Sequence, residues 1–441
     1  MDKESLKRNA VAAIESRRKD LIRIGRDLYD MPETGFEEYR SAAYAKHILE
    51  SLGLTVESGI ACTGLRAQAS GRTHTYRIAV LGELDALLLP SHPHADPVTG
   101  AAHACGHFAQ IVMMLGTAMG LIGGNVIPHL NGDVVFMGVP AEESVRIGFR
   151  QQLRAEGKLV FLSGKQEFIR LGMYDGVDAV ISGHLSNTGS IGKFRHSVTH
   201  NGIIIKALRF YGVSAHAGMQ PEAGINALQA AVNAINNINA LRSSLPYAER
   251  PRIHFIITKG GDSVNIIPDD VRMELCVRAA SLPVMEALDA RVDRAVRAGA
   301  ETVGAKVDID NLGLYMPSHP DRTLNRIFAE NASRIAGTDN VIDASDIHRG
   351  SSTDVGDVAA LLPYCYFIFG GASGTAHKTD FDVADENFAY VEPAKASAMT
   401  VIDLLADDGS ALRKVRENYR PAFPDKEAYL AFCRGKLGFD N

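Results

Sequence analysis

The sequence predicts an α/β protein with a mixed, helix-covered sheet that is interrupted by a smaller α+β unit. Three observations carry this prediction. The chain has 441 residues, and single hydrophobic cores tend to split into domains beyond about 250–300 residues. In the first part, short and uniformly apolar runs alternate with helical patterns, as in sheets that are covered on both faces. The middle part changes to a different order of strands and helices.

The first part begins with a charged helical pattern, MDKESLKRNAVAAIESRRKDL, which does not have the form of a signal peptide. Apolar, β-branched-rich runs that end in glycine, proline or polar residues then indicate buried strands. Amphipathic patterns between them indicate helices. The predicted strands are 77–82, 134–139, 177–182 and, far downstream, 364–369; the predicted helices include 41–54 and 109–121.

The middle part has the order βαββαβ, which is typical of a split-βαβ sandwich. A unit of about 110 residues is large enough to fold as a domain. We therefore expect residues 197–310 to form an inserted domain, and residues 1–196 and 311–441 to form a discontinuous one. The predicted elements are strand 203–211, helix 225–242, strands 252–258 and 271–278, helix 283–304 and strand 306–310.

Composition excludes several classes of protein. A formal net charge of −6 and a pI near 6.2 argue against nucleic-acid binding, which needs a basic surface. No apolar run approaches the roughly 20 residues that span a bilayer, so we expect no membrane segment. Five widely spaced cysteines do not form a disulfide framework. A reducing, cytoplasmic location is therefore expected.

Candidate ligand groups follow the ends of the predicted strands. In an open α/β sheet, the carboxyl ends of the strands are where ligands bind. A mixture of thiolate, imidazole and carboxylate in one cleft suits Zn²⁺ or a neighbouring transition metal. The candidates are Glu83, Asp85, Cys105, His107, Glu142, Glu143, His184 and His377.

Each of these residues can also be purely structural. A lone Cys105 is usually a small core residue. His107 or His184 alone is more often a hydrogen-bonded histidine, and Glu142 and Glu143 are more often part of a solvated loop. The combination of His-Ala-Cys-Gly-His with a Glu-Glu pair and two histidines near strand ends favours a metal site.

The Glu-Glu pair predicts a division of labour. Adjacent carboxylates on an extended loop point in different directions, so one can bind metal while Glu142 acts as general base. Two metals about 3.5–4 Å apart can activate a bridging water and polarise a carbonyl, with Cys105 as the shared ligand. Thiol catalysis by Cys105, paired with His103 or His107, is an alternative. Nearby carboxylates argue against it, because they raise the pKa of a thiol.

Several longer motifs carry a family resemblance. With them, the chain resembles the aminoacylase/carboxypeptidase metallopeptidases, in the amidohydrolase branch of auxin-conjugate and aminobenzoyl-glutamate hydrolases. SSTDVGDVA is most similar to the group of the aminobenzoyl-glutamate hydrolase B-subunit and β-alanyl-dipeptidase-like proteins. The motifs are MPETGFEEYRSA (31–42), GELDAL (82–87), HACGH (103–107), PAEE (140–143), GVSAHAGMQPEAGINAL (212–228), SVNIIPD (263–269), SSTDVGDVA (351–359) and TAHKTDF (375–381).

The resemblance implies a metallopeptidase-type catalytic domain with a ferredoxin-like inserted domain that serves as lid and dimerisation surface. A homodimer or higher homo-oligomer follows from it. It also implies two divalent metal ions, with Zn²⁺ first and Mn²⁺, Co²⁺ or Ni²⁺ as alternatives, and Glu142 as the base. The implied metal ligands are Cys105, His107, Glu143, His184 and His377.

Three residues of the inserted domain complete the implied site. His216 resembles a family histidine that reaches the active site, often that of the partner subunit, and stabilises an oxyanion. Such a hydrogen-bond donor stabilises the transition state by about 2.7–4 kcal/mol. Asn265 and Arg278 match positions that lie near the substrate's carboxylate in relatives. The guanidinium group of an arginine suits this place, because it can bind a carboxylate through two hydrogen bonds. The alternatives are that His216 only caps the following helix and that Arg278 is a surface strand residue.

The chain departs from the family pattern at two places. Phe108 follows HACGH where an acidic or amide residue is usual, and the segment 144–176 is long and lacks the glycine-rich continuation of PAEE. Within it, residues 158–165 either reshape the pocket or form a surface helix. No role is assigned to residues 411–441. These departures affect substrate identity more than metal binding.

The predicted function is metal-dependent hydrolysis of an amide bond. The substrate is a small molecule with a free carboxylate: an N-acylated amino acid, an aminobenzoyl-glutamate-type conjugate or a short dipeptide. The alternative is a catalytically silent relative that binds a ligand or partner. Glu142 argues against that alternative, because a binding module has no need of a base.

Overall fold

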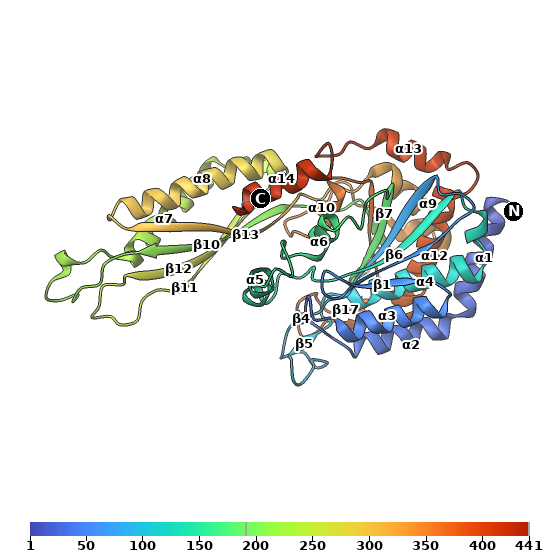
Figure 1. Cartoon of the computed structure of the whole chain (residues 1–441), viewed down its shortest axis with the longest axis horizontal. Coiled ribbons are helices and arrows are strands. Elements are labelled where there is room, and N and C mark those ends of the chain that lie inside the picture. Colours follow the sequence, from blue (N-terminus) through green and yellow to red (C-terminus); the bar gives the residue numbers. More distant parts are fainter. Residues whose placement is uncertain (190–191, 440–441) are drawn as a thin grey trace. The chain divides into compact units, whose positions relative to one another are not determined.

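The chain folds as two compact units (Figure 1). The computed structural model describes residues 1–189 and 192–439. Unit 1 comprises Met1–Val198, His319–Ile347 and Val358–Ala422, and unit 2 comprises Thr199–Ser318, His348–Asp357 and Phe423–Asn441. Within the described ranges, no helix has the length and apolar character needed to cross a bilayer.

Unit 1 is built on an eight-stranded mixed sheet. Its four central strands, β6, β3, β7 and β16, run parallel to their neighbours within that group. Nearly all their residues are buried, as expected for parallel strands that are covered on both faces. In sheet order the strands are β1 (Val56–Ile60), β2 (Gly64–Ala69), β6 (Gly132–Val139), β3 (Tyr76–Glu83), β7 (Ala179–Leu185), β16 (Tyr364–Phe369), β8 (Phe194–His196) and β14 (Val341–Asp343).

The central helix of unit 1 is α4 (His107–Gly123), which packs against β3 and β7. It is buried from its first residue to Leu121, and its sequence is apolar on every side, as expected for a helix in the core. Helices α1 (Lys3–Ser16) and α12 (Glu392–Leu405) pack on α4, while α9 (Arg322–Ala336) packs against β16. The amino end of α4 therefore lies at the sheet edge where β3 and β7 end.

Unit 2 has the βαββαβ order that the sequence predicts, and its four strands are all antiparallel. The sheet order is β11-β12-β10-β13. Apolar residues that alternate along β10 and β12 pack under two helices and leave the other face of the sheet open. The elements are β10 (Gly202–Tyr211), α7 (Ala227–Leu241), β11 (Arg252–Lys259), β12 (Asp270–Ala279), α8 (Leu282–Glu301) and β13 (Lys306–Tyr315).

Two details differ from the sequence prediction. Strand β7 extends to Leu185, which pairs with Phe369 of β16, so His184 lies within the strand and not after it. The C-terminal helix α14 (Lys426–Leu437) packs on β13 of unit 2, where Lys436 Nζ lies 3.1 Å from a carboxylate oxygen of Glu286. The structure thus groups 423–441 with unit 2, whereas the sequence pattern predicted 311–441 to belong to the other domain.

Candidate functional site

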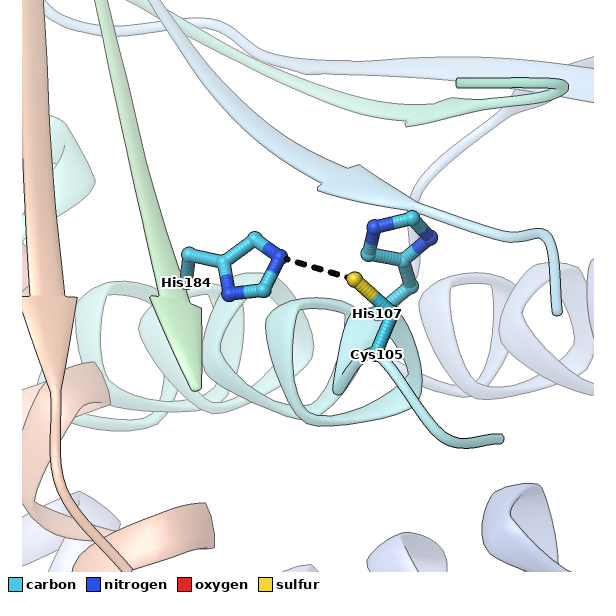
Figure 2. A group of neighbouring side chains, drawn as sticks. All are labelled: Cys105, His107 and His184. Carbon is cyan, nitrogen blue, oxygen red and sulfur yellow. Dashed lines mark hydrogen bonds between the residues drawn. The ribbon is translucent and has the colours of Figure 1, made fainter. Parts of the chain in front are cut away.

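Two groups of metal-ligand side chains meet in unit 1. Cys105, His107 and His184 offer ligand atoms that all lie within 4.8 Å of one another (Figure 2). Cys105, Glu143 and His377 do the same. Cys105 Sγ lies 3.4 Å from His184 Nε2, and Glu143 Oε1 lies 3.1 Å from His377 Nε2. All five ligands predicted from the sequence are therefore neighbours, and Cys105 belongs to both groups.

The backbone of the HACGH turn requires a glycine. Gly106 has φ 103°, and a Cβ atom at this position would lie 2.9 Å from Leu185 Cβ. The turn places Cys105 just before α4 and His107 at its first residue. The loop that carries His377 is tied to the same turn, because His377 N donates to Ala104 O at 2.8 Å.

Non-glycine residues in left-handed conformation flank the site. Ala141, next to Glu142, has φ 57°, and His377 has φ 67°. Such conformations are uncommon for residues with a Cβ atom, and they concentrate at functional sites. The strained backbone thus coincides with the loops that carry the candidate ligands and base.

His107, which is buried, and His184, which is half-buried, both present Nε2 to the site. His107 Nδ1 donates to Asp85 Oδ1 and Asp85 O, both at 3.0 Å, and His184 Nδ1 donates to Leu185 O at 2.7 Å. Because these partners are acceptors, a neutral ring carries its proton on Nδ1, which leaves the Nε2 lone pair for an ion. Asp85 Oδ2 also accepts from Glu143 N at 2.8 Å. Asp85 thus orients two candidate ligands, a role that was not predicted from the sequence.

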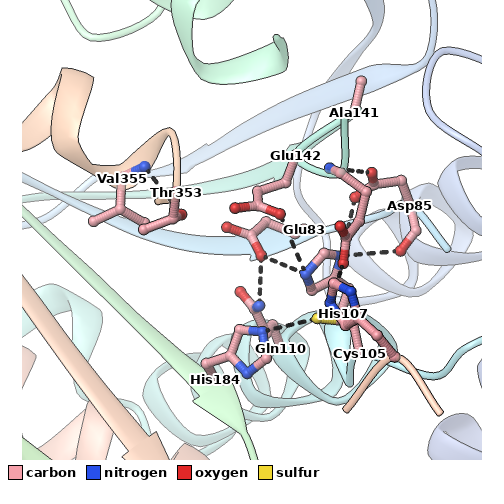
Figure 3. Close-up of polar contacts among 12 residues, drawn as sticks. Glu83, Asp85, Cys105, His107, Gln110, Ala141, Glu142, His184, Thr353 and Val355 are labelled. Atoms are coloured by element: carbon pink, nitrogen blue, oxygen red, sulfur yellow. Dashed lines mark hydrogen bonds and ion pairs between the residues drawn. The ribbon is translucent and has the colours of Figure 1, made fainter. Parts of the chain in front are cut away.

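A third carboxylate, Glu83, lies beside His107 (Figure 3). Glu83 Oε2 is 3.2 Å from His107 Nε2 and accepts from Gln110 Nε2 at 2.6 Å, while Lys165 Nζ pairs with Oε1. Burial raises the pKa of Glu83, but the charges of Lys165 and His107 outweigh this effect and hold the pKa at about 2. Glu83 is therefore anionic, with both oxygens occupied.

Lys165 resolves the alternatives left open for residues 158–165. It lies in α6 (Gly164–Arg170), and its side chain is fully buried. The segment therefore reaches the neighbourhood of the site through Lys165 and is not simply a surface helix. The sequence around Lys165 is polar and its partner Glu83 lies 82 positions away, so the local pattern does not indicate this pair.

Glu142 lies close to the first ligand group. Its Oε2 atom is 3.8 Å from His107 Nε2, and Glu83, His107 and Glu142 form a third group of mutually close ligand atoms. Glu142 is absent from the group of Cys105, Glu143 and His377. The two adjacent glutamates thus face different neighbours, as expected from the sequence.

The donor atoms shift one another's protonation. Burial, together with the charge of Glu143, raises the pKa of the Cys105 thiol well above its usual value. Burial opposes charge on His107, but Cys105 and Glu83 raise the pKa of His107 well above its usual value. A thiol with a raised pKa is a poor nucleophile, which argues against thiol catalysis. His103, the other proposed partner, is buried against Phe108 with a ring-centroid distance of 5.1 Å, and burial lowers its pKa to about 3.

The residues fit a divalent cation. Among residues 1–189 and 192–439, neither His107 Nε2 nor Glu143 Oε1 has a partner in hydrogen-bond geometry, although both atoms are buried. Buried polar atoms are normally satisfied, so these two atoms require a further partner. Thiolate, imidazole and carboxylate are the donors that Zn²⁺ and its neighbours prefer.

His216 and Asn265 lie together in unit 2. Their loops are joined by a hydrogen bond from Ala217 N to Asn265 O at 2.9 Å. His216 is exposed, and its Nδ1 accepts from Gly218 N and Met219 N, both at 3.2 Å. The ring thus caps the following turn through Nδ1.

Arg278 lies at the other end of the same sheet. The loops of His216 and Asn265 join the sheet at Asp270, eight residues before Arg278 in β12, which is about 27 Å at roughly 3.4 Å per residue. Arg278 Nη1 donates to Ser352 Oγ at 2.7 Å. The structure thus brings His216 and Asn265 together but separates them from Arg278.

Comparisons with known proteins identify a family and proteins of similar sequence and fold. Residues 79–392 match the sequence model of peptidase family M20/M25/M40. Xaa-Arg dipeptidase of Mus musculus is 27% identical over 439 residues, which cover 95% of this chain and 93% of that protein. The B-subunit of p-aminobenzoyl-glutamate hydrolase of Escherichia coli is 30% identical over 300 residues, which cover 65% of this chain and 56% of that protein. The fold is similar to that of Bacillus subtilis YXEP, described as a dinuclear metal binding peptidase from the M20 family. The TM-score is 0.69 and the sequence identity 22%, and the match covers 89% of this chain and 99% of that one.

Proposed function

This chain belongs to peptidase family M20/M25/M40 and is a metal-dependent hydrolase, and we propose that it cleaves the amide bond of a dipeptide or an N-acylated amino acid. The observation that carries the proposal is the pair of ligand groups that share Cys105, with Glu142 beside them. The names of the relatives support it, since a dipeptide and aminobenzoyl-glutamate are both amide-linked compounds.

We assign one ion to Cys105, His107 and His184 and the other to Cys105, Glu143 and His377. Zn²⁺ suits this donor set best, with Mn²⁺, Co²⁺ or Ni²⁺ as alternatives. When bound, the two ions would polarise the scissile carbonyl and lower the pKa of a water molecule.

Glu142 serves as the general base in this proposal. It takes a proton from the attacking water and passes it to the leaving nitrogen. Its position 3.8 Å from His107 Nε2 supports this role, because it keeps the carboxylate next to the ligand groups. A base in such a place contributes about 10²–10⁴-fold to the rate. The base and both ligand groups are present, so nothing in the described residues favours a silent relative.

His216 serves as the oxyanion donor. Its Nδ1 accepts two backbone N–H groups, so a neutral ring carries its proton on Nε2 and can donate from there. A hydrogen-bond donor aimed at a developing oxyanion stabilises the transition state by about 2.7–4 kcal/mol.

Asn265 and Arg278 are proposed to bind the carboxylate of the substrate. Because they lie at opposite ends of the unit 2 sheet, one chain cannot direct both at the same carboxylate. A homodimer, in which the loops of His216 and Asn265 serve the second copy, removes this conflict. The separation of these residues thus supports the proposed homodimer.

The test is Glu142→Gln, assayed on a panel of dipeptides, N-acetyl amino acids and p-aminobenzoyl-glutamate with Zn²⁺-, Mn²⁺- or Co²⁺-loaded protein. We expect kcat to fall about 10²–10⁴-fold while two metals per chain are retained by elemental analysis. Glu156→Gln, at an exposed position that pairs with the nearby Gln152 and Lys158, is the matched control and keeps full turnover. A Glu142→Gln enzyme with normal kcat would remove Glu142 from the reaction.

A further inference from the structure

A buried guanidinium contacts the loop that follows β6. Arg150 belongs to α5 (Ile147–Ala155), and its side chain is fully buried. In the described part of the chain it forms no ion pair, and its hydrogen bonds go to backbone carbonyls. Nη1 donates to Leu162 O at 2.7 Å and to Ala141 O at 3.3 Å, and Nη2 donates to Glu143 O. A buried charge without an opposite charge is costly, so these carbonyls have to compensate it.

The contact with Ala141 bears directly on Glu142, the next residue of the loop (Figure 3). The peptide group that precedes Glu142 contains Ala141 O, which accepts from Arg150. The peptide group that follows Glu142 contains Glu143 N, which donates to Asp85 Oδ2 at 2.8 Å. These two planar groups set the φ and ψ angles of Glu142. Arg150 therefore holds one of the two groups that determine where the side chain of Glu142 points.

The backbone that Arg150 contacts has an uncommon conformation. Ala141 has φ 57°, and a residue with a Cβ atom keeps such a conformation only where its surroundings hold it. Its N–H group donates to Glu38 Oε1 at 2.9 Å, and its carbonyl accepts from Arg150. Without Arg150 this conformation loses one of its anchors, so we expect the loop to relax.

The guanidinium fits closely into its place. Its Cζ atom lies 5.3 Å from the ring centroid of Phe36. A Cβ atom at Gly35 would lie 2.5 Å from Arg150 Nη2 and 2.8 Å from the Cα atom of Ala141. The rigid fork of a guanidinium can join several carbonyls at once, whereas the single ammonium of a lysine is a point charge on a flexible stem. The position therefore suits an arginine next to a glycine.

We propose that Arg150 is a positioning residue, which aims the carboxylate of Glu142 by holding the peptide group before it. The inference rests on the proposed function, because Glu142 acts as a base only in that hydrolysis. Arg150 belongs to the segment 144–176, which departs from the family pattern, so the resemblance implies no role for it. In this role the segment acts on the reaction through the shape of the loop that carries the base.

The kinetic test compares Arg150→Met and Arg150→Lys with the wild type on the fastest substrate of the panel. We expect Arg150→Met to lower kcat about 10²-fold, since a misplacement of about 1 Å can cost that much. KM and metal content should stay at wild-type values, and Arg150→Lys should recover part of kcat because it keeps the charge and a donor.

Arg154→Met is the matched control for these variants. It removes a guanidinium from the same helix, whose Nε donates to Val160 O at 2.9 Å, and it should keep wild-type kcat. A normal kcat in Arg150→Met, together with the expected loss in Glu142→Gln, would overturn the inference and leave the hydrolase standing.

Two further variants locate the effect at Glu142. Gly35→Ala should lower kcat in the same way, because its Cβ atom displaces the guanidinium from Ala141. In the double variant Glu142→Gln/Arg150→Met, kcat should fall no further than in Glu142→Gln, since residues that act as a unit are not additive. An equal fold-loss from Arg150→Met in both backgrounds would show that Arg150 only supports the fold.

Hydrogen exchange separates this inference from the proposed function, because it needs no turnover. Exchange of the zinc-loaded wild type and Arg150→Met is followed by mass spectrometry. We expect the amides of residues 141–143 to exchange at least about tenfold faster in the variant, while those of β16 keep wild-type rates. Wild-type exchange at residues 141–143 would overturn the inference even if no substrate of the panel is hydrolysed.

Discussion

Glu38 shows how one buried carboxyl group supports the loop of the general base. It is fully buried; Ala141 N donates to its Oε1 at 2.9 Å, and Thr63 Oγ1 donates to its Oε2. Burial and the nearby charge of Asp85 raise the pKa of Glu38 to about 8. Near neutral pH the group is therefore mostly protonated, and it holds the residue next to Glu142 without adding charge.

Replacing Glu38 with glutamine should change how stability depends on pH. In the unfolded chain a glutamate titrates near pKa 4.3, so between about pH 4.3 and 8 the folded state binds more protons. Wild-type stability is then lost as pH rises through this window, by at most about 1.4 kcal/mol per pH unit. A glutamine does not titrate, so Glu38→Gln does not lose stability in this way. The free energy of unfolding of Glu38→Gln should therefore increase relative to that of the wild type from pH 5 to pH 8.

Urea unfolding of the metal-free proteins at several pH values measures this difference. Glu57→Gln, at an exposed position of β1, is the control and should show a difference from wild type that does not vary with pH. A pH-independent difference for Glu38→Gln as well would show that Glu38 titrates normally in the folded protein.

Motif spacing allowed the candidate ligands to be predicted, because each lies in a short motif with an unusual combination of donors. The residues that support them carried no such signal. Gln110 contacts Glu83 across 27 positions, and Glu38 contacts Ala141 across 103. A glutamine on a helix and a glutamate just before one are ordinary in sequence, so only the packed structure reveals these contacts.

Among the elements, buried parallel strands were the easiest to predict. Residues 364–369 coincide with β16, because a continuous apolar run of this length with flanking turn residues is typical of a buried strand. The end of β7 was missed, since Gly183 and His184 do not continue the apolar run. Pairing with β16 extends that strand, and this contact between distant segments is not visible in the local pattern.

Helix α6 is tied to the end of β3 by the buried pair of Lys165 and Glu83. Removing one partner of such a pair leaves an uncompensated buried charge, which costs about 3–5 kcal/mol. Lys165→Met should therefore lower the free energy of unfolding by about that amount. The double variant Lys165→Met/Glu83→Gln should recover part of the loss, because the lone charge is gone.

Urea unfolding of the two single variants and the double variant gives the coupling energy of this pair. Lys158→Met is the control, since the ion pair of Lys158 with Glu156 is exposed and its loss should change stability by less than about 1 kcal/mol. A Lys165→Met protein as stable as the wild type would show that α6 is not held by this pair.

For the whole chain, sequence patterns located the inserted α+β unit well but not every segment that joins it. The order and lengths of its strands and helices are local patterns, whereas the place of α14 depends on a few contacts with β13 and α8. Asn311 Nδ2, for example, donates to Lys436 O at 2.5 Å. An amphipathic C-terminal helix does not reveal in its sequence which unit it packs against.

If the His216 loop serves a second copy, two inactive variants should restore each other. In a mixed dimer of Glu142→Gln and His216→Ala chains, one of the two sites receives both Glu142 and His216. Random exchange in a twofold dimer then returns about a quarter of wild-type activity. Activity is measured after mixing and subunit exchange, which native mass spectrometry confirms.

The control for this experiment mixes Glu142→Gln with the double variant Glu142→Gln/His216→Ala, which leaves no site with the base and should stay inactive. Complete subunit exchange between Glu142→Gln and His216→Ala without any regained activity would contradict the shared site.

X-ray absorption at the zinc edge of the zinc-loaded protein tests most directly whether Cys105 joins two metal sites. We predict two zinc ions per chain, each with one sulfur neighbour at about 2.3 Å and nitrogen or oxygen neighbours at about 2.0–2.2 Å. Scattering between the two ions should appear at about 3.5–4 Å, and Cys105→Ser should remove the sulfur signal. A spectrum with only nitrogen and oxygen neighbours, or without the zinc–zinc signal, would contradict the shared-thiolate centre.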